Sequence, residues 1–100
     1  MPKLAINIPH TLGREEASRR LKGFVERLKE KHQDKVGNLQ EEWADNSLKF
    51  SFSTFGFKFS GVGTVDESEV KMDVDYPFAA AMFKGKIESE IRETLTRVLG

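Results

Sequence analysis

The sequence predicts a single α+β domain over residues 1–100, in which an antiparallel sheet carries two helices on one face. Residues 48–76 alternate apolar and polar side chains, the period of a strand with one buried face. Two other stretches repeat apolar residues at helical spacing. The expected element order is β-α-β-β-β-β-α. Because the four later strands cannot bury their apolar face alone, we expect both helices to cover it.

The first strand and the first helix are predicted from the N-terminal third of the chain. Residues 3–8 alternate as a strand does, and Pro9 ends that strand because proline has no N–H for the ladder. Gly13 is an acceptable helix cap, and the acidic Glu15 and Glu16 suit the positive first turn. We expect this helix to end near His32. Its apolar stripe is Ala17, Leu21, Phe24, Val25 and Leu28.

A weaker strand is predicted over residues 36–43, joined to the next strand by a turn at 44–47. This turn sets Trp43 opposite Leu48, Glu41 opposite Phe50 and Leu39 opposite Phe52. Glu41 then lies on the apolar face, and two interpretations stay open. The carboxylate either reaches the sheet edge or a pocket, or the strand carries a bulge and Glu41 points to water.

The stretch 48–76 predicts three strands with turns at Phe55-Gly56 and at residues 66–69. Both turns place the same apolar set on one face, and a slip of one residue would split that set. Phe52 is expected near the centre of the sheet, in contact with both helices. The residues expected to face the helices are Phe50, Phe52, Phe57, Phe59, Val70, Met72 and Val74.

The last helix is predicted from Pro77, which suits a first turn. Its apolar stripe is Ala80, Phe83, Ile87, Ile91, Leu95 and Val98. Placing the first strand beside the fifth gives the sheet order 2-3-4-5-1. By analogy this arrangement is a reduced helix-grip fold.

Composition excludes several classes of function. The formal charge is zero, which argues against a nucleic-acid partner, and the chain has no cysteine for disulfides or thiolate chemistry. Neither a signal-peptide pattern nor an apolar run of membrane-spanning length is present. We therefore expect a cytoplasmic protein with no membrane span. A homodimer is compatible with the sequence.

Candidate catalytic and metal-binding residues are few. No G-x-S-x-G motif occurs, and the glycines of residues 60–63 lack the Lys-Ser/Thr of a phosphate-binding loop. His10 and His32 have no ligand-spaced partner, so we expect both to be exposed. Asp73 and Asp75 share a polar face and are expected to be solvated rather than to hold a cation. No catalytic residue, metal or cofactor is predicted.

Two candidate binding surfaces remain. Glu41, Trp43, Gly61 and Gly63 are the residues expected to line a ligand site between the sheet and the last helix. Phe55 and Gly56 are the residues expected to bind a surface, since they form the predicted hairpin tip. Phe55 has the wrong parity for the core, so it is either an exposed anchor or folds back over a helix end.

Three stretches in order carry a family resemblance: IPHTLGREEASRRL, LKFSFSTFGFKFSG and FKGKIESEIRETL. With them the chain resembles the small bacterial family of polyhydroxyalkanoic acid system proteins over nearly its whole length. The resemblance implies association with polyhydroxyalkanoate storage granules or their regulation. It supplies no catalytic residues.

Four functions therefore compete. The first is a non-catalytic protein that binds the granule surface or a granule protein. The alternative is a small helix-grip module that holds an apolar or acyl ligand. An enzyme acting on hydroxyacyl esters and a nucleic-acid binder are both disfavoured. A cavity beneath Gly61 and Gly63 would favour the ligand module, and a packed core would favour surface binding.

Overall fold

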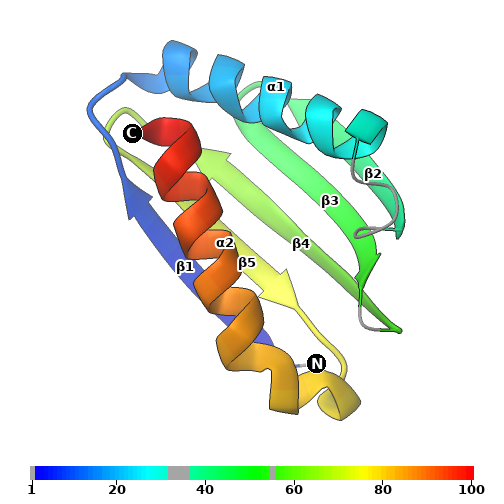
Figure 1. The fold of residues 1–100 in the computed structure, drawn as a ribbon. Helices are drawn as coiled ribbons and strands as arrows, with labels where there is room; N and C mark the ends of the chain where they lie inside the picture. The colour runs from blue at the N-terminus through cyan, green and yellow to red at the C-terminus, as the bar shows by residue number, and fades with distance from the viewer. Residues whose placement is uncertain (1, 32–36, 55) are drawn as a thin grey trace.

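The computed structural model describes residues 2–31, 37–54 and 56–100, which form one antiparallel sheet with both α-helices on the same face (Figure 1). The strand order is β1-β5-β4-β3-β2, which confirms the predicted order and the α+β class. The elements are β1 (Lys3–Pro9), α1 (Arg14–Lys31), β2 (Gly37–Ala44), β3 (Ser47–Thr54), β4 (Phe57–Val65), β5 (Glu69–Asp75), the 3₁₀ helix η1 (Phe78–Phe83) and α2 (Lys84–Leu99).

The predicted register of the central strands is confirmed. Phe52 pairs with Phe59 between β3 and β4, and Val65 pairs with Val70 between β4 and β5. All seven residues predicted to face the helices belong to the hydrophobic core or pack against it. Period-2 patterning is strong evidence for register because a one-residue slip would expose this whole set to water.

The edge strand β2 departs from the predicted register at its start. Gln40 pairs with Ser51, but Gly37 pairs with Ser53, so β2 holds one residue more than β3 over this interval. Asn38 has φ +51°, a conformation that asparagine tolerates better than most residues. The predicted pair of Leu39 with Phe52 falls inside this β-bulge, where Asn38 and Leu39 together lie opposite Phe52.

The centre of the core is Phe59 rather than Phe52. Phe59 is 1% exposed, whereas Phe52 is half-buried and stacks on it with ring centroids 5.3 Å apart. α1 packs against β4 and α2 packs against β1, so the helical cover is centred on the β4 side of β3. The centre of the core therefore lies on β4, one strand away from the position on β3 that was predicted for it.

The last helix begins later than predicted. Pro77 precedes η1, and α-helical structure starts only at Lys84. In a 3₁₀ helix residues three apart lie one above the other. Ala80 and Phe83 are such a pair, and they face the body of the protein: Ala80 is fully buried and Phe83 packs against the core.

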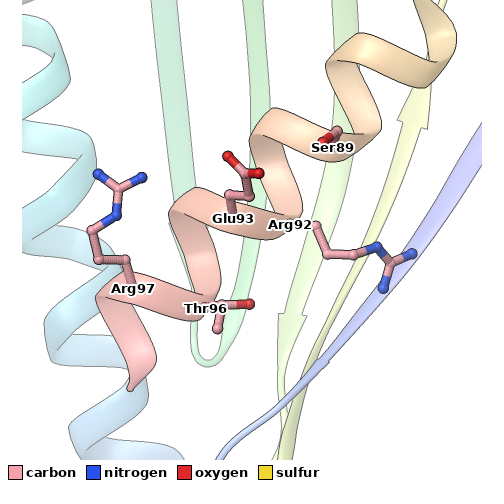
Figure 2. Close-up of a pocket in the computed structure, with 5 residues that line it drawn as sticks. All are labelled: Ser89, Arg92, Glu93, Thr96 and Arg97. Atoms are coloured by element: carbon pink, nitrogen blue, oxygen red, sulfur yellow. The ribbon is translucent and has the colours of Figure 1, made fainter.

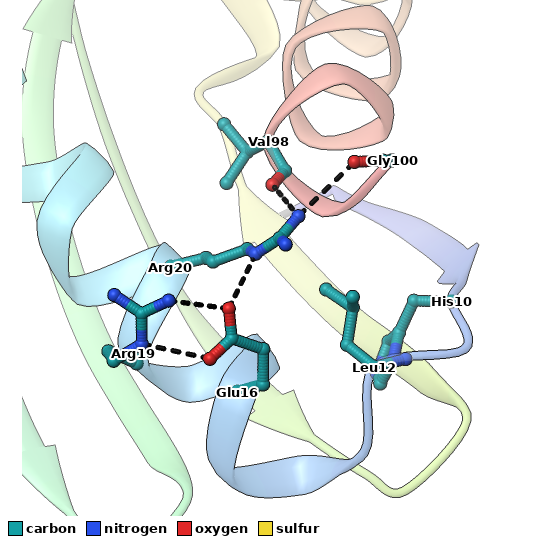
Figure 3. Close-up of polar contacts among 7 residues, drawn as sticks. All are labelled: His10, Leu12, Glu16, Arg19, Arg20, Val98 and Gly100. Carbon is teal, nitrogen blue, oxygen red and sulfur yellow. Dashed lines mark hydrogen bonds and ion pairs between the residues drawn. The ribbon is translucent and has the colours of Figure 1, made fainter.

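Arg20 joins the two α-helices (Figure 3). Its Nη1 donates to the carbonyl oxygens of Val98 at 3.5 Å and Gly100 at 3.2 Å, at the end of α2. Its Nε donates to Glu16 at 2.8 Å, and Arg19 donates to the same carboxylate at 2.9 Å. The hydrogen bonds from Arg19, and then from Arg20, lower the pKa of Glu16 to about 2. Glu16 therefore stays ionised and keeps Arg20 oriented towards α2.

His10 is buried, contrary to the prediction that it is exposed; its exposed fraction is 8%. The Leu12 N–H donates to His10 Nδ1 at 3.2 Å, so Nδ1 carries no hydrogen and Nε2 donates to the carbonyl oxygen of Asp66 at 3.1 Å. The His10 backbone N–H also donates to Ser68 at 2.8 Å. The segment after β1 is thereby fastened to the β4–β5 turn. His32 lies outside the described residues.

Replacing His10 with phenylalanine keeps a ring of similar shape but removes both side-chain hydrogen bonds. Leu12 N–H and the Asp66 carbonyl then lose a partner, so we expect the free energy of unfolding to fall by about 1–3 kcal/mol in urea denaturation. The exposed neighbour Thr11 is the control, and Thr11→Ala is expected to change stability by less than about 0.5 kcal/mol. An unchanged stability for His10→Phe would show that the two bonds contribute nothing.

Candidate functional site

The space above the two predicted ligand-site glycines is filled. A Cβ added at Gly61 would lie 2.7 Å from Cζ of Phe50, and one added at Gly63 would lie 2.6 Å from Sδ of Met72. Carbon and sulfur atoms never approach so closely without a shift. The glycines thus admit the side chains of neighbouring strands, and these side chains occupy the place where a ligand cavity was considered.

Glu41 and Trp43 lie on the helix-covered face, where their register predicted them. The Glu41 side chain is 12% exposed, 3.8 Å from Lys29 Nζ of α1, and accepts a hydrogen bond from Trp43 Nε1 at 3.4 Å. Lys22 Nζ lies 5.0 Å from the centre of the Trp43 ring. The bulge in β2 comes before Glu41 and does not turn it to water. Glu41 joins a polar cluster between α1 and β2.

The four predicted ligand residues therefore form two groups, Glu41 with Trp43 and Gly61 with Gly63. Glu41, Phe50 and Gly61 follow one another across three strands, so Phe50 stands between the Glu41 cluster and the glycines. A role for any of the four in binding a ligand stays a prediction.

One surface depression lies on α2 and another on the edge formed by β2 and β3, and neither is lined by Gly61 or Gly63. The larger, about 560 Å³, lies along α2, and Figure 2 shows its lining residues Ser89, Arg92, Glu93, Thr96 and Arg97. Arg92 there already bonds Glu88 and the Asn7 carbonyl, at 3.1 and 3.4 Å. The smaller, about 240 Å³, is lined by Gln40, Glu41, Glu42, Lys49, Phe50 and Ser51. Both are open and mixed in charge, without a convergent set of catalytic groups.

Metal ligands are not gathered anywhere in the described ranges: no group of three or more histidine or acidic side chains is placed to hold an ion. Asp73 pairs across the sheet with Ala5 and Val62, and Asp75 pairs with Lys3 and Ser60. These neighbours offer no further carboxylate. The two aspartates thus lie on the outer, helix-free face, as their alternation predicted.

The most unusual surface of the molecule is η1, whose sequence FAAAMF contains no polar side chain. Phe78 and Met82 are each 82% exposed, and Ala79 and Ala81 are exposed beside them. Large apolar side chains that are exposed singly are common, but a run of them at one place marks an interaction site. Sequence reasoning missed this surface because it placed only Ala80 and Phe83 of the run in the apolar stripe of the last helix and assigned no role to the other four residues. The signal was present as six successive apolar residues, too many for one stripe.

The end of β3 and the start of β4 lie at the same end of the molecule as η1 (Figure 1). The ring centroid of Phe57, at the start of β4, is 6.0 Å from that of Phe83 at the end of η1. Gly56 is exposed with φ +78°, as a tight turn requires. Phe55, the predicted surface anchor, lies outside the described residues.

Comparison with protein families matches residues 4–99 to a family described as polyhydroxyalkanoic acid system protein. The chain belongs to this family. Polyhydroxyalkanoic acid system proteins were the family that the three sequence stretches resembled, so that resemblance is confirmed. A comparison with curated protein sequences gives no match.

Among solved structures, the polyhydroxyalkanoic acid system protein is similar to TTHA0849 from Thermus thermophilus. The TM-score is 0.58 at 16% sequence identity, and the match covers 98% of this chain and 92% of the other. At this identity the similarity concerns the fold alone. Within the described ranges, no helix is long and apolar enough to cross a membrane.

Proposed function

We propose that this polyhydroxyalkanoic acid system protein is a non-catalytic binding protein that acts at polyhydroxyalkanoate storage granules or in their regulation. We further propose that it attaches to the granule through η1. The observation that carries the proposal is the exposure of an entirely apolar turn at one end of a small, well-packed domain. The family supplies the cellular setting.

The size of the exposed side chains makes this attachment energetically sufficient. Burying a large apolar side chain contributes about 1.5–3 kcal/mol, so Phe78 and Met82 together contribute about 3–6 kcal/mol before the costs of association. η1 is also held firmly, because Ala80 is fully buried and Phe83 contacts Phe57. The backbone of η1 is therefore already ordered and loses little entropy on binding, so the entropic cost comes from the rotamers of the Phe78 and Met82 side chains.

The non-catalytic part of the proposal is supported by the sequence, which has no cysteine and no nucleophile elbow. The alternative of an acyl ligand beneath α2 has less support, since Phe50 and Met72 fill the space above Gly61 and Gly63. A packed core at this position favours surface binding over the ligand module.

Co-sedimentation with isolated polyhydroxyalkanoate granules tests the proposal. Phe78→Ser/Met82→Ser is expected to lower the partition onto granules at least about tenfold, because it removes the exposed apolar area. Thermal stability should change little, as both side chains are exposed. The matched control is Val62→Ser, which removes a 42% exposed apolar side chain from the helix-free face of the sheet.

Two outcomes would contradict the proposal. If the double variant sediments with granules as the unchanged protein does, η1 is not the attachment surface. If Val62→Ser weakens binding as much as the double variant, attachment depends on general surface hydrophobicity rather than on η1.

A further inference from the structure

The charges next to η1 are arranged against the usual preference of a helix. α2 begins with Lys84 and Lys86, and no acidic residue lies in its first turn. The N-terminal end of a helix carries a partial positive charge and ordinarily attracts acidic side chains. α1 follows that preference, with Glu15 and Glu16 in its first turn. The start of α2 therefore concentrates positive charge directly beside the exposed apolar turn.

Other elements at this end add to the positive charge. Lys58 is the second residue of β4, next to the hairpin tip. Lys3 begins β1, and the backbone N–H of Tyr76, just before η1, donates to the carbonyl oxygen of Pro2 at 3.1 Å. The acidic groups nearby are Asp75, which faces Lys3 across the strands, Glu88, which is bonded to Arg92, and Glu90, one helical turn after Lys86. Basic side chains thus outnumber acidic ones around η1.

We propose that η1 and the first turn of α2 form an anchor for an anionic lipid surface. Phe78 and Met82 enter the outer part of the apolar layer, while Lys84 and Lys86 lie at the level of the phosphate groups. A six-residue 3₁₀ helix is only about 12 Å long, which suits shallow insertion rather than spanning. Apolar burial combined with basic side chains is the pairing of forces by which proteins bind such interfaces.

Two other kinds of partner for η1 match the basic side chains around it less well. A bare polyester surface is neutral and would give the lysines no counter-charge. A second copy of the chain, docked η1 against η1 about a two-fold axis, would bring the same lysines of both copies together, and like charges repel. An anionic lipid interface can bury the exposed apolar side chains of η1 and attract the neighbouring lysines at the same time. This inference rests on the proposed function, because it names the chemistry of the surface that η1 meets.

Vesicle flotation with the full chain tests the inference. Vesicles of phosphatidylcholine alone are compared with vesicles that also contain phosphatidylglycerol. We expect binding to the anionic vesicles, weaker binding to the neutral ones, and release by added salt. Lys84→Gln/Lys86→Gln should weaken binding to anionic vesicles roughly tenfold or more, and Phe78→Ser/Met82→Ser at least as much.

Controls separate local from general effects. Lys31→Gln/Lys49→Gln removes the same charge from exposed positions at the end of α1 and on β3, and is expected to bind as the unchanged protein does. Lys84→Arg/Lys86→Arg should retain binding. If the two glutamine variants weaken binding equally, only net charge matters and the inference is overturned.

Lipid-free polyester particles distinguish failure of this inference from failure of the proposed function. If the protein binds the particles through η1, and neutral and anionic vesicles equally or not at all, the granule function stands and the lipid inference is overturned. If it binds neither particles nor vesicles nor granules, both are overturned. Binding to anionic vesicles that depends on Lys84, Lys86, Phe78 and Met82 supports the inference.

Discussion

Replacing Phe59 with alanine is expected to lower the free energy of unfolding by about 3–5 kcal/mol. Phe59 is the largest fully buried side chain of the described core, and it lies where β4 is covered by α1. Its removal leaves a cavity that the surrounding strands cannot close. It also removes the stacking contact with Phe52. Such a loss would unfold much of a domain of ordinary stability.

Phe52→Ala is the matched comparison, because the two rings pair directly across β3 and β4. Phe52 is half-buried, so less apolar area is lost, and we expect a decrease of about 1–3 kcal/mol. Urea denaturation of both variants measures the difference. If Phe52→Ala costs as much as Phe59→Ala, or more, the core is centred on β3 and our assignment of its centre is wrong.

Gly61→Ala is expected to be as damaging as the loss of a core side chain, at about 3 kcal/mol, although it adds only one methyl group. That Cβ would overlap the backbone carbonyl oxygen of Asp73 and would lie 2.7 Å from Cζ of Phe50. The Phe50 ring can turn aside, but the Asp73 backbone belongs to β5. It cannot move without disturbing the pairing of β5 with β4.

Gly85→Ala is the control for the loss of a glycine. Gly85 lies in α2, and an added Cβ there meets no atom within 4 Å. Alanine reduces the conformational entropy of the unfolded chain, so the free energy of unfolding of this variant should rise by about 0.5–1 kcal/mol. Thermal unfolding should thus shift in opposite directions for the two glycine variants. A neutral Gly61→Ala would mean that the β4–β5 contact is looser than described.

The central register and the strand order were predictable because the alternation over residues 48–76 has only one solution that keeps the apolar set together. Three local features could not be predicted from the sequence pattern. The bulge coincides with the positive φ of Asn38, which the apolar pattern does not reveal. The burial of His10 depends on Asp66, which is 56 residues away. The 3₁₀ geometry of η1 shares its i,i+3 spacing with an α-helix, so an apolar pattern cannot distinguish them.

The candidate site was predictable in part. Parity alone placed Glu41 on the helix-covered face, but its ion pair with Lys29 depends on how α1 crosses the sheet. The glycines of β4 were expected to line a ligand site, whereas they admit the ring of Phe50 and the thioether of Met72. η1 was not identified as a surface, although its six successive apolar residues are more than one helical stripe can bury.

The pairing of β1 with β5 also governs the order in which the chain can fold. β2, β3, β4 and β5 are joined to their neighbours by short turns, whereas Lys3 pairs with Asp75, at the far end of the meander. During synthesis β1 therefore leaves the ribosome long before its partner β5 has been made, and it stays unpaired through most of translation. The slow closure of so long a loop makes β1 the last strand that we expect to join, after the hairpins have formed locally.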